Sequence, residues 1–333
     1  MTTRVIALAT VVATIGAAAG CGSSKNTSST GSSGGSSTAA TKKNIKIGVS
    51  FDVVEPIRNA ELKGIKEEAA KQGATVDFQS ANNDPQTQAS QIRDMIETKK
   101  DDAIIAIAQN ADQIVASIRL ANQRKVPFIA IDRAPGKGAN VTYQITGDPK
   151  ADGGAVGKFM NDSGKQLNAL LLVGALTDAN AIGRRDGFKE AVSGSSKVKI
   201  AAEVPTDWDP QKALSGTQNA LQKNPKINAV FSPSDILLGA VHSALKSAGK
   251  NPKDVTIVTI DGDDNGCKAI KNKTLSADVA TPVEEFGVKA VQAAVKAASG
   301  QAVDTAVEQL PGTVLDQSNV AQQAAQVWGC KVQ

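Results

Sequence analysis

The sequence predicts an α/β protein of two doubly wound, parallel-sheet, Rossmann-like lobes. Three observations support this fold class. Short β-branched runs alternate with longer amphipathic stretches from residue 43 onward, the alternation repeats in two similar halves, and the 291 residues after residue 42 (333 minus 42) exceed what one open-sheet core usually organises. We place the first lobe at residues 43–146 plus 280–307 and the second at 147–279 plus 308–333.

Strands and helices are expected in strict alternation, which predicts parallel strands with helices on both faces of each sheet. Strands are expected at residues 45–50, 75–78, 103–108, 128–131, 142–145, 169–173, 198–204, 229–231, 255–260 and 276–279. Helices are expected at residues 60–72, 86–98, 113–123, 154–161, 183–192, 210–222, 237–247 and 283–298. Gly73, Asn224–Pro225 and Gly249 supply the residues that commonly end helices.

The two halves share one internal pattern. Residues 88–132 and 214–261 each contain a helix, an apolar strand, a polar turn, a second helix and a second apolar strand. Each copy ends in an aspartate, Asp132 in the first and Asp261 in the second. Two similar half-chains predict two similar lobes.

The beginning of the chain has the features of an export signal. Arg4 precedes an apolar run at residues 5–19, which is shorter than the roughly 18 to 20 residues of a membrane span. Residues 18–21 resemble a bacterial lipobox, in which Cys21 would carry the lipid, although the pattern prefers Leu at the place of Ala18. We expect a signal peptide at residues 1–20; a simple cleaved signal with an incidental Cys21 is the alternative.

Residues 21–42 are expected to form a flexible tether after the lipidated cysteine. They are almost entirely Gly, Ser, Thr and Ala, a composition that buries too little apolar surface to fold.

The Lys and Arg residues of the whole chain are scattered, and the net charge is +4. This distribution is typical of a solvated surface, so we expect no nucleic-acid partner.

Two further cysteines, Cys267 and Cys330, are candidates for a disulfide. In an exported protein two such cysteines pair more often than they stay free. Closing a loop of this length would stabilise the fold by about 4 kcal/mol in the chain-entropy model. Two unrelated buried thiols are the alternative.

Polar residues follow the predicted strands, where open parallel sheets bind their ligands. These residues are Asp52, Gln109, Asn110, Asp132, Arg133, Asp148, Asp178, Asn180, Trp208, Ser234, Asp235 and Asp261. Ionised Asp accepts hydroxyl hydrogens, and Arg donates from a planar fork. An aromatic ring offers an apolar face to the C–H side of a sugar. The set therefore predicts a site for a polyhydroxylated ligand.

The motifs of residues 43–322 resemble those of type I periplasmic sugar-binding proteins of the ribose- and xylose-binding group. Asp132–Arg133 matches the ligand-binding Asp-Arg pair of that family, and Asp261 matches its second-lobe aspartate. Arg184 opens the family's Arg-x-x-Gly-Phe pattern, and Trp208 occupies its aromatic position after a second-lobe strand. The resemblance implies the type I periplasmic-binding-protein fold, in which a hinge joins the two lobes, and a substrate-binding lipoprotein of an ABC transporter.

Other motif positions bear on the ligand. Residues 79–96 are closest to the xylose branch, whereas residues 55–58 replace the first-loop aromatics of ribose-binding relatives. Ser234 replaces an Asn before Asp235, and Thr281 replaces the Gln or Lys of relatives. With aromatics at only 3%, the pocket is expected to hydrogen-bond more than it stacks. These differences favour a pentose, a pentitol or a tetritol.

The residues expected to bind ligand are Asp132, Arg133, Arg184, Asp261, Trp208, Glu55, Arg58, Asp52, Asn110, Asn180, Ser234 and Thr281. Each also has a purely structural interpretation. Asp132 could hold a turn, Asp261 could cap a helix, Arg184 could pair with Asp186, and Trp208 could only pack. His242, in an apolar helical stretch, is expected in the core.

We therefore expect an exported, lipid-anchored solute-binding protein of an ABC importer at the outer face of the cell membrane or in the periplasm. It would bind a small sugar or polyol by hinge closure as a monomer, delivering it to a permease with a cytoplasmic ATPase. No catalytic residue, metal or cofactor is expected, because phosphate, dinucleotide and nucleophile motifs are absent from the sequence. A receptor for a membrane signalling protein and a sugar-acting enzyme are the alternatives.

Overall fold

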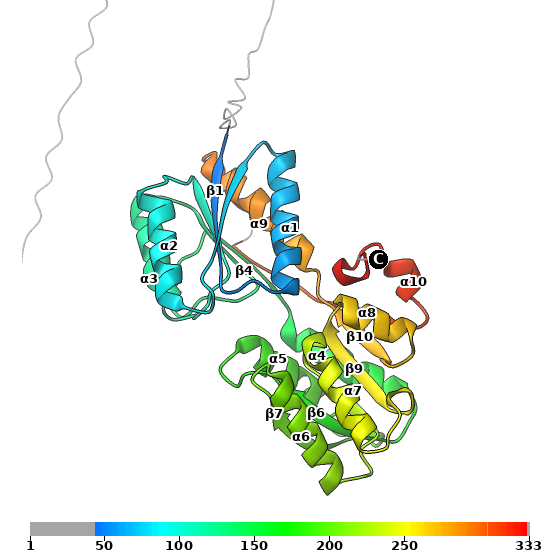
Figure 1. Ribbon diagram of the computed structural model, residues 1–333. Helices are drawn as coiled ribbons and strands as arrows, with labels where there is room; N and C mark the ends of the chain where they lie inside the picture. The colour runs from blue at the N-terminus through cyan, green and yellow to red at the C-terminus, as the bar shows by residue number, and fades with distance from the viewer. Residues whose placement is uncertain (1–43, 305, 332–333) are drawn as a thin grey trace, which may run out of the picture. The chain divides into compact units, whose positions relative to one another are not determined.

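The computed structural model describes residues 44–304 and 306–331, and these residues form two α/β lobes, each built on a six-stranded sheet (Figure 1). The predicted signal peptide, Cys21 and the predicted tether at 21–42 lie outside the described residues. No helix in the described ranges is both long enough and apolar enough to cross a membrane. Two doubly wound sheets are what the sequence predicts.

The first lobe contains a fully parallel sheet with the strand order β11-β5-β4-β3-β1-β2. Its strands are β1 (Lys46–Phe51), β2 (Thr75–Ser80), β3 (Ala103–Ala106), β4 (Phe128–Ile131), β5 (Tyr143–Gly147) and β11 (Val307–Leu310). The central strands are buried on both faces, which explains their near-continuous runs of Ile, Val and Ala.

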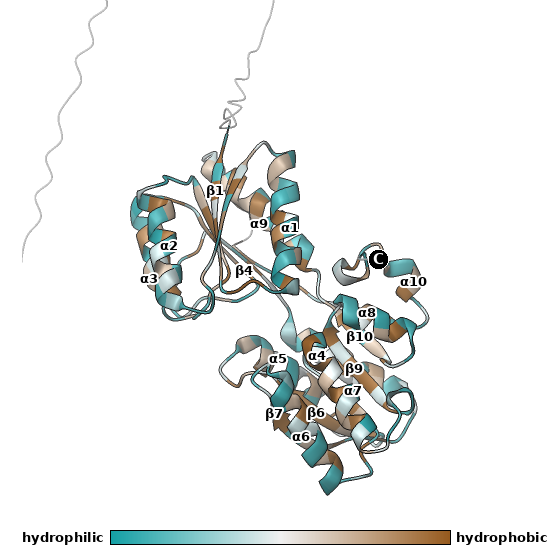
Figure 2. Cartoon of the chain, viewed as in Figure 1, coloured by the Kyte–Doolittle hydropathy of each residue, from teal (hydrophilic) through white to brown (hydrophobic). Residues whose placement is uncertain are grey.

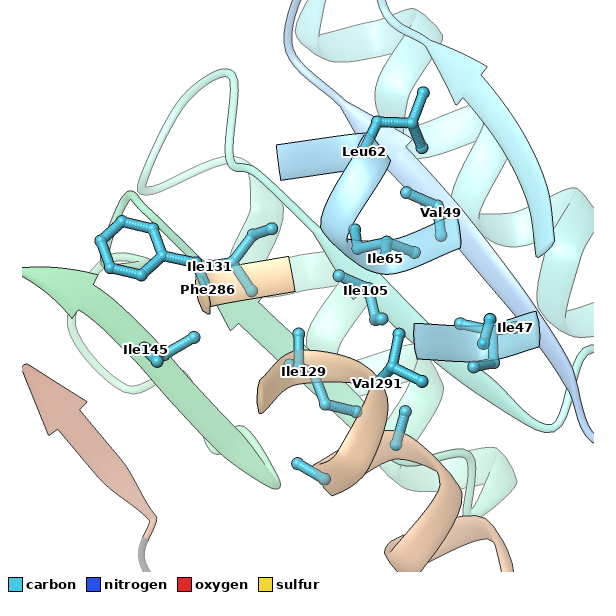
Figure 3. Packing of buried hydrophobic residues seen from close by; sticks show 14 of the residues in the cluster. Ile47, Val49, Leu62, Ile65, Ile105, Ile129, Ile131, Ile145, Phe286 and Val291 are labelled. Atoms are coloured by element: carbon cyan, nitrogen blue, oxygen red, sulfur yellow. The ribbon is translucent and has the colours of Figure 1, made fainter. Parts of the chain in front are cut away.

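Helices cover both faces of the first sheet. They are α1 (Pro56–Lys71), α2 (Pro85–Glu97), α3 (Ile114–Arg124) and α9 (Val283–Ala298). Alternate residues along the strands point to opposite faces. Ile105 packs with the buried residues of α1 and α9, and its neighbour Ile104 packs with those of α2 and α3. Figure 3 shows the first of these clusters around Ile105, Ile129 and Phe286.

The second lobe contains a sheet with the strand order β12-β10-β9-β8-β6-β7. Its strands are β6 (Leu167–Val173), β7 (Val198–Pro205), β8 (Ala229–Phe231), β9 (Thr256–Asp261), β10 (Ala277–Ala280) and β12 (Thr313–Asp316). All neighbours are parallel except β12, which pairs with β10 antiparallel. The sheet is therefore mixed at this edge, where the sequence predicts only parallel strands.

The second sheet is also covered on both faces. Its helices are α4 (Pro149–Asp162), α5 (Ala179–Ala191), α6 (Pro210–Lys223), η1 (Asp235–Leu237), α7 (Leu238–Ser247), η2 (Pro252–Asp254), α8 (Asp264–Lys271), α10 (Val320–Gln323) and η3 (Trp328–Cys330). Helices α4 and α5 share one buried cluster with the sheet, and α6, α7 and α8 share the other. Helices such as α6 carry both apolar and polar residues, as expected for elements that cover a sheet (Figure 2).

The two sheets repeat one topology, because β2-β1-β3-β4-β5 and β7-β6-β8-β9-β10 follow the same order. The chain passes between the sheets after β5, after β10 and between β11 and β12. Strands β11 and β12 and helix α8 are not predicted from the sequence. Each strand has only four residues, and its mixed polarity shows neither the alternation nor the continuous apolar run that predicts a strand.

Several helices begin earlier than their apolar periodicity indicates, because an aspartate caps the first turn. Helix α4 begins at Pro149, and the Asp148 side chain accepts a hydrogen bond from the Ala151 N–H at 2.9 Å. Helix α5 begins at Ala179, with the Asp178 side chain accepting from the Asn180 N–H at 2.8 Å. Short polar side chains at the N-cap satisfy N–H groups that have no partner within the helix.

A disulfide joins Cys267 on α8 to Cys330 on η3, with the Cα atoms 5.5 Å apart. His242, expected in the core, is half-buried on α7, and its Nε2 lies 2.9 Å from the Thr274 carbonyl oxygen. An edge position on the helix, and not the centre of the apolar face, explains this difference from the expectation.

Candidate functional site

A cavity of about 220 Å³ is lined by strand-end residues of both sheets. All the residues expected to bind ligand except Asn110 and Thr281 line it, namely Asp52, Glu55, Arg58, Asp132, Arg133, Asn180, Arg184, Trp208, Ser234 and Asp261. Its walls also contain Val53, Pro56, Ile57, Asn83, Asp178, Ile236, Asp263 and Trp328, which were not on the expected list.

Asn110 and Thr281 lie elsewhere. Asn110 lines an adjoining cavity of about 540 Å³, and its Oδ1 accepts hydrogen bonds from the backbone N–H groups of Asp112 and Gln113 at 3.1 and 3.0 Å. Thr281 is 4% exposed and lines a separate cavity beside Glu284. Both residues follow strands, so their strand-end position alone does not bring them into the 220 Å³ cavity.

Asp132 and Asp261 occupy equivalent places in the two lobes. Asp132 follows β4, and Asp261 ends β9. Strand β4 is the fourth in the sheet order β2-β1-β3-β4-β5, and β9 is the fourth in the order β7-β6-β8-β9-β10. Both aspartates have positive φ angles, 60° and 134°. The Arg133 N–H donates to the Ile131 carbonyl at 2.7 Å, which closes a three-residue turn around Asp132. Such unusual backbone conformations concentrate at functional sites.

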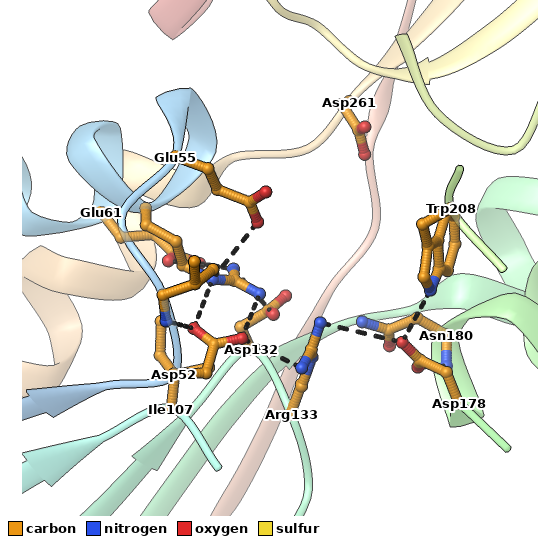
Figure 4. Close-up of polar contacts among 12 residues, drawn as sticks. Asp52, Glu55, Glu61, Ile107, Asp132, Arg133, Asp178, Asn180, Trp208 and Asp261 are labelled. Atoms are coloured by element: carbon orange, nitrogen blue, oxygen red, sulfur yellow. Dashed lines mark hydrogen bonds and ion pairs between the residues drawn. The ribbon is translucent and has the colours of Figure 1, made fainter. Parts of the chain in front are cut away.

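Arg58 organises the carboxylates of the first lobe, although its side chain is only 4% exposed. Its Nε donates to Asp52 Oδ1 at 3.0 Å, and its Nη1 lies 2.9 Å from Asp132 Oδ2. Nη1 also lies 3.2 Å from Glu61 Oε2 (Figure 4). Arg58 therefore fixes the orientation of Asp52 and Asp132.

Glu61 is a fully buried member of this network that was not predicted. Burial raises its pKa well above the ordinary value, and the nearby Asp132 and Asp52 carboxylates add to this shift, while Arg58 opposes it. Burial also lowers the pKa of Arg58, but Asp132, Glu61 and Asp52 together raise it. The spacing of Arg58 and Glu61, three residues apart on α1, was the available sequence signal.

Arg133 reaches from the first lobe toward the second. Its Nη1 lies 3.0 Å from Asp52 Oδ2, and its Nη2 lies 3.9 Å from Asp178 Oδ2 (Figure 4). The Nε of Arg133 is buried and has no hydrogen-bond partner in the described residues. Asp178 in turn accepts a hydrogen bond from the Trp208 Nε1–H at 3.3 Å.

Arg184 and Ser234 hold the second-lobe aspartate. Arg184 Nη1 donates to the Pro233 carbonyl at 2.6 Å and lies 3.1 Å from Asp261 Oδ1, while the Ser234 hydroxyl donates to Asp261 Oδ2. Arg184 does not pair with Asp186, which binds Arg185 instead. Burial raises the pKa of Asp261, although Arg184 and Ser234 oppose this shift.

Two indole rings border the cavity. Trp208, half-buried with φ of 62°, lies so close to Gly174 that a Cβ on that glycine would be 2.3 Å from Trp208 Cζ2. Trp328 lines the same cavity from η3. The site thus combines oriented carboxylates, guanidinium groups and aromatic faces, which is the donor and acceptor set suited to hydroxyl groups. The described residues include no group of His, Cys, Asp and Glu side chains arranged to hold a metal ion.

Comparisons with known proteins identify relatives of this chain and solved structures with a similar fold. Residues 47–302 match the periplasmic binding protein domain family. The ribose import binding protein RbsB of Salmonella typhimurium is 32% identical over 72% of this chain and 80% of its own length. The D-xylose-binding periplasmic protein of Escherichia coli is 31% identical over 79% of this chain and 81% of its own.

A solved ABC transporter solute binding protein from Mycobacterium smegmatis, with bound glycerol, is 26% identical with a TM-score of 0.75. The match covers 84% of this chain and 96% of that one. The family match spans both sheets, and the curated relatives are covered over most of their length. This chain is a member of the periplasmic binding protein domain family.

Proposed function

We propose that the protein is an extracytoplasmic solute-binding protein of an ABC importer, binding one small sugar or polyol between its lobes by hinge closure. The observation that carries the proposal is that Asp132 and Asp261, from equivalent strand ends, line one cavity. A ligand gripped by both lobes stabilises the closed arrangement through contacts that the open one lacks. A permease with its ATPase would then distinguish loaded from empty protein.

The cavity supports a compact, uncharged, hydroxyl-rich ligand. Its volume of about 220 Å³ lies below the roughly 300 to 1,000 Å³ typical of sites for drug-sized molecules. More carboxylates than guanidinium groups line it: Asp52, Glu55, Asp132, Asp178, Asp261 and Asp263 against Arg58, Arg133 and Arg184. This balance disfavours acidic and phosphorylated sugars. A pentose, a pentitol or a tetritol fits these constraints, and two of the relatives are named for the pentoses ribose and D-xylose.

We expect the protein to release its ligand without modifying it chemically. The carboxylates that would serve as acid and base are each engaged by a guanidinium group, Asp132 by Arg58 and Asp261 by Arg184. Incubation of the protein with each binding sugar, followed by chromatography, should return the same sugar. Formation of any product would favour an enzyme.

The proposal includes the arrangement of the whole chain: a signal peptide at residues 1–20, lipidation at Cys21, a tether at 21–42, and a monomeric pair of lobes outside the cytoplasmic membrane. Growth with a labelled fatty acid tests the anchor directly. The label should be incorporated into the wild-type protein and lost in Cys21→Ser. Equal labelling of both would remove Cys21 as the anchor.

A thermal-shift screen tests the ligand class. The panel contains pentoses, hexoses, tetritols, pentitols and inositols, with glucuronate and ribose 5-phosphate as acidic comparators. A ligand at 100 times its Kd adds about 2.7 kcal/mol of stability, which raises Tm by several degrees. Pentoses or small polyols should give the largest shift and the acidic compounds none. A flat result across the neutral compounds would refute a sugar or polyol as ligand.

Hinge closure and transport need separate measurements. Small-angle scattering should show a smaller radius of gyration when the best panel compound is bound. Deletion of the gene should lower uptake of the same labelled compound. Normal uptake with a lost transcriptional response would assign the protein to signalling instead of import.

A further inference from the structure

Residues 327–331, here called the docking segment, are attached to the turn at residues 261–264 that bears Asp261. The Trp328 Nε1–H donates to the Asp261 carbonyl oxygen at 3.0 Å. The Gly329 N–H donates to the Gly262 carbonyl oxygen at 3.2 Å. Since hydrogen bonds require a short distance and a well-aligned donor, this side-chain contact and this backbone contact together fix the docking segment against the turn.

Two glycines make this close approach possible. A Cβ at Gly329 would lie 2.2 Å from the carbonyl carbon of Asp263, so only glycine fits there. Gly262 has φ of 78°, and a Cβ on it would lie 3.1 Å from Val327 Cγ1. The backbone of the docking segment therefore rests directly on the backbone of the turn.

Covalent and ionic contacts hold the docking segment at its far end. The disulfide joins its Cys330 to Cys267 on α8. Lys331 Nζ pairs with Glu284 Oε2, and Glu284 Oε1 lies 2.8 Å from Lys63 Nζ. The docking segment is thus attached to α8 of the second lobe and, through Glu284 on α9, to the first.

Trp328 extends from this segment into the binding site. It packs with the buried cluster of the first lobe, is 9% exposed, and lines the cavity that Asp132 and Asp261 share. The chain contains two tryptophans, Trp208 and Trp328, and both line this cavity. One lies beside Asp178 and the other beside Asp261, so a ligand can contact an indole at each of two positions.

We propose that Trp328 is a ligand-contacting residue, offering its indole to the C–H face of a sugar or polyol, and that the Cys267–Cys330 disulfide and Gly329 position it. The contact rests on the proposed function. Because Trp328 also holds the Asp261 carbonyl, displacing the docking segment alters both an aromatic contact and the backbone that orients a carboxylate. Loss of the disulfide therefore lowers ligand affinity although neither cysteine reaches the cavity.

The first experiment needs no ligand. In a Trp208→Phe background, Trp328 is the remaining tryptophan, and acrylamide quenching of its fluorescence measures its accessibility. Quenching should be weak with the disulfide intact and rise severalfold in Cys267→Ser/Cys330→Ser and in Gly329→Ala. Unchanged quenching in these variants would overturn the positioning role.

The second experiment measures Kd by calorimetry for D-ribose, D-xylose, erythritol and xylitol. The paired Cys→Ser variant and Gly329→Ala should each weaken the tightest of these by about tenfold. Trp328→Phe, which keeps a ring but loses the N–H, should weaken it less than Trp328→Leu. Met160→Ala is the control, because Met160 lies on the buried face of α4 in the second-lobe core: the change should lower Tm and leave Kd unchanged.

The outcomes separate the two proposals. If wild type binds and Trp328→Leu keeps full affinity, the ligand contact is wrong while the proposed function stands. If wild type binds none of the four compounds and the wider screen is flat, the proposed function fails and the ligand contact fails with it. In that case the quenching experiment still decides whether the disulfide positions Trp328.

Discussion

The carboxyl groups of Asp235 and Asp278 converge on Gly266 in the second lobe. A Cβ at Gly266 would lie 2.3 Å from Asp278 Oδ2 and 2.6 Å from Asp235 Oδ2. Both aspartates are buried, and Asp235 Oδ1 and Asp278 Oδ2 have no hydrogen-bond partner in the described residues. Burial raises the pKa of Asp278 to about 7 and that of Asp235 well above its ordinary value. The charge of Asp278 adds to the rise at Asp235, whereas a hydrogen bond with Asp235 opposes the rise at Asp278. Asp235 follows Ser234, so this acid pair lies directly behind the candidate site.

We expect this pair to make stability depend on pH. The folded pKa of Asp278 lies above the ordinary value, so its stabilising contribution is complete below about pH 4 and is lost as pH rises through about 7. Within that window the folded protein binds one more proton than the unfolded chain, so the free energy of unfolding falls by about 1.4 kcal/mol for each unit that pH rises. The free energy of unfolding of Asp278→Asn should depend less on pH than that of wild type. Its advantage over wild type should grow by about 2 kcal/mol as pH rises from 5 to 8.

Urea unfolding at several pH values measures this effect. Asp162→Asn, at an exposed position on α4, is the control and should leave the shape of the curve unchanged. Parallel curves for wild type and Asp278→Asn would show that Asp278 is ionised in the folded protein throughout the range.

The two strand-end aspartates should be required for binding. Asn is the substitution to use, because it tolerates the positive φ of Asp132 better than Ala and keeps one oxygen acceptor. Hydrogen bonds to a charged group contribute about 1.5 to 3 kcal/mol. Asp132→Asn and Asp261→Asn should each weaken binding of the best panel compound by about 10- to 100-fold.

Calorimetry and circular dichroism together measure this prediction, since affinity should fall while the folded spectrum persists. Asp148→Asn, which changes another strand-end aspartate outside the cavity, is the matched control and should retain affinity. Full affinity in either site variant would remove that aspartate from the site.

Arg58 should be essential for the stability of the first lobe. Its side chain is 4% exposed and pairs with Asp52, Glu61 and Asp132. Arg58→Met leaves these carboxylates without their shared cation, and breaking a buried ion pair typically costs about 3–5 kcal/mol. The loss should be greater at pH 8 than at pH 5, because burial raises the pKa of Glu61 and its protonation at low pH removes part of the charge repulsion.

Arg124→Met provides the comparison for that measurement. Arg124 pairs with Glu97 on the surface, where its side chain is 52% exposed, and exposed pairs contribute about 0–1 kcal/mol. Denaturant unfolding should separate the two arginines clearly. Equal losses would mean that Arg58 is not the centre of a buried network.

Gly174 should determine the position of Trp208. A Cβ 2.3 Å from the indole cannot be accommodated without moving the ring, so Gly174→Ala should shift the tryptophan emission and weaken ligand binding by about tenfold. Gly239→Ala is the control, because a Cβ at Gly239 meets nothing within 4 Å and Ala favours the helix. An unchanged emission spectrum in Gly174→Ala would contradict this packing.

The sequence alone determined the architecture, because periodicity records which faces each element buries. Runs of apolar and β-branched residues such as β3 and β9 predicted buried parallel strands, and the repeated pattern ending in Asp132 and Asp261 predicted two lobes of one topology. The sequence motifs resemble those of periplasmic sugar-binding proteins, and residues 47–302 match the periplasmic binding protein domain family. The short edge strands β11 and β12 were not predicted, because four residues with mixed polarity carry too little periodic signal.

Tertiary structure decided which polar residues meet. Asn110 and Asp132 both follow strands of one sheet. The Asn110 side chain, however, accepts a hydrogen bond from the Gln113 backbone N–H and lines the adjoining cavity. Glu61 and Trp328 are far from any predicted strand end, and only packing brings them to Arg58 and Asp261. Local sequence patterns encode burial and backbone direction, whereas contacts between distant side chains depend on how helices and turns pack in three dimensions.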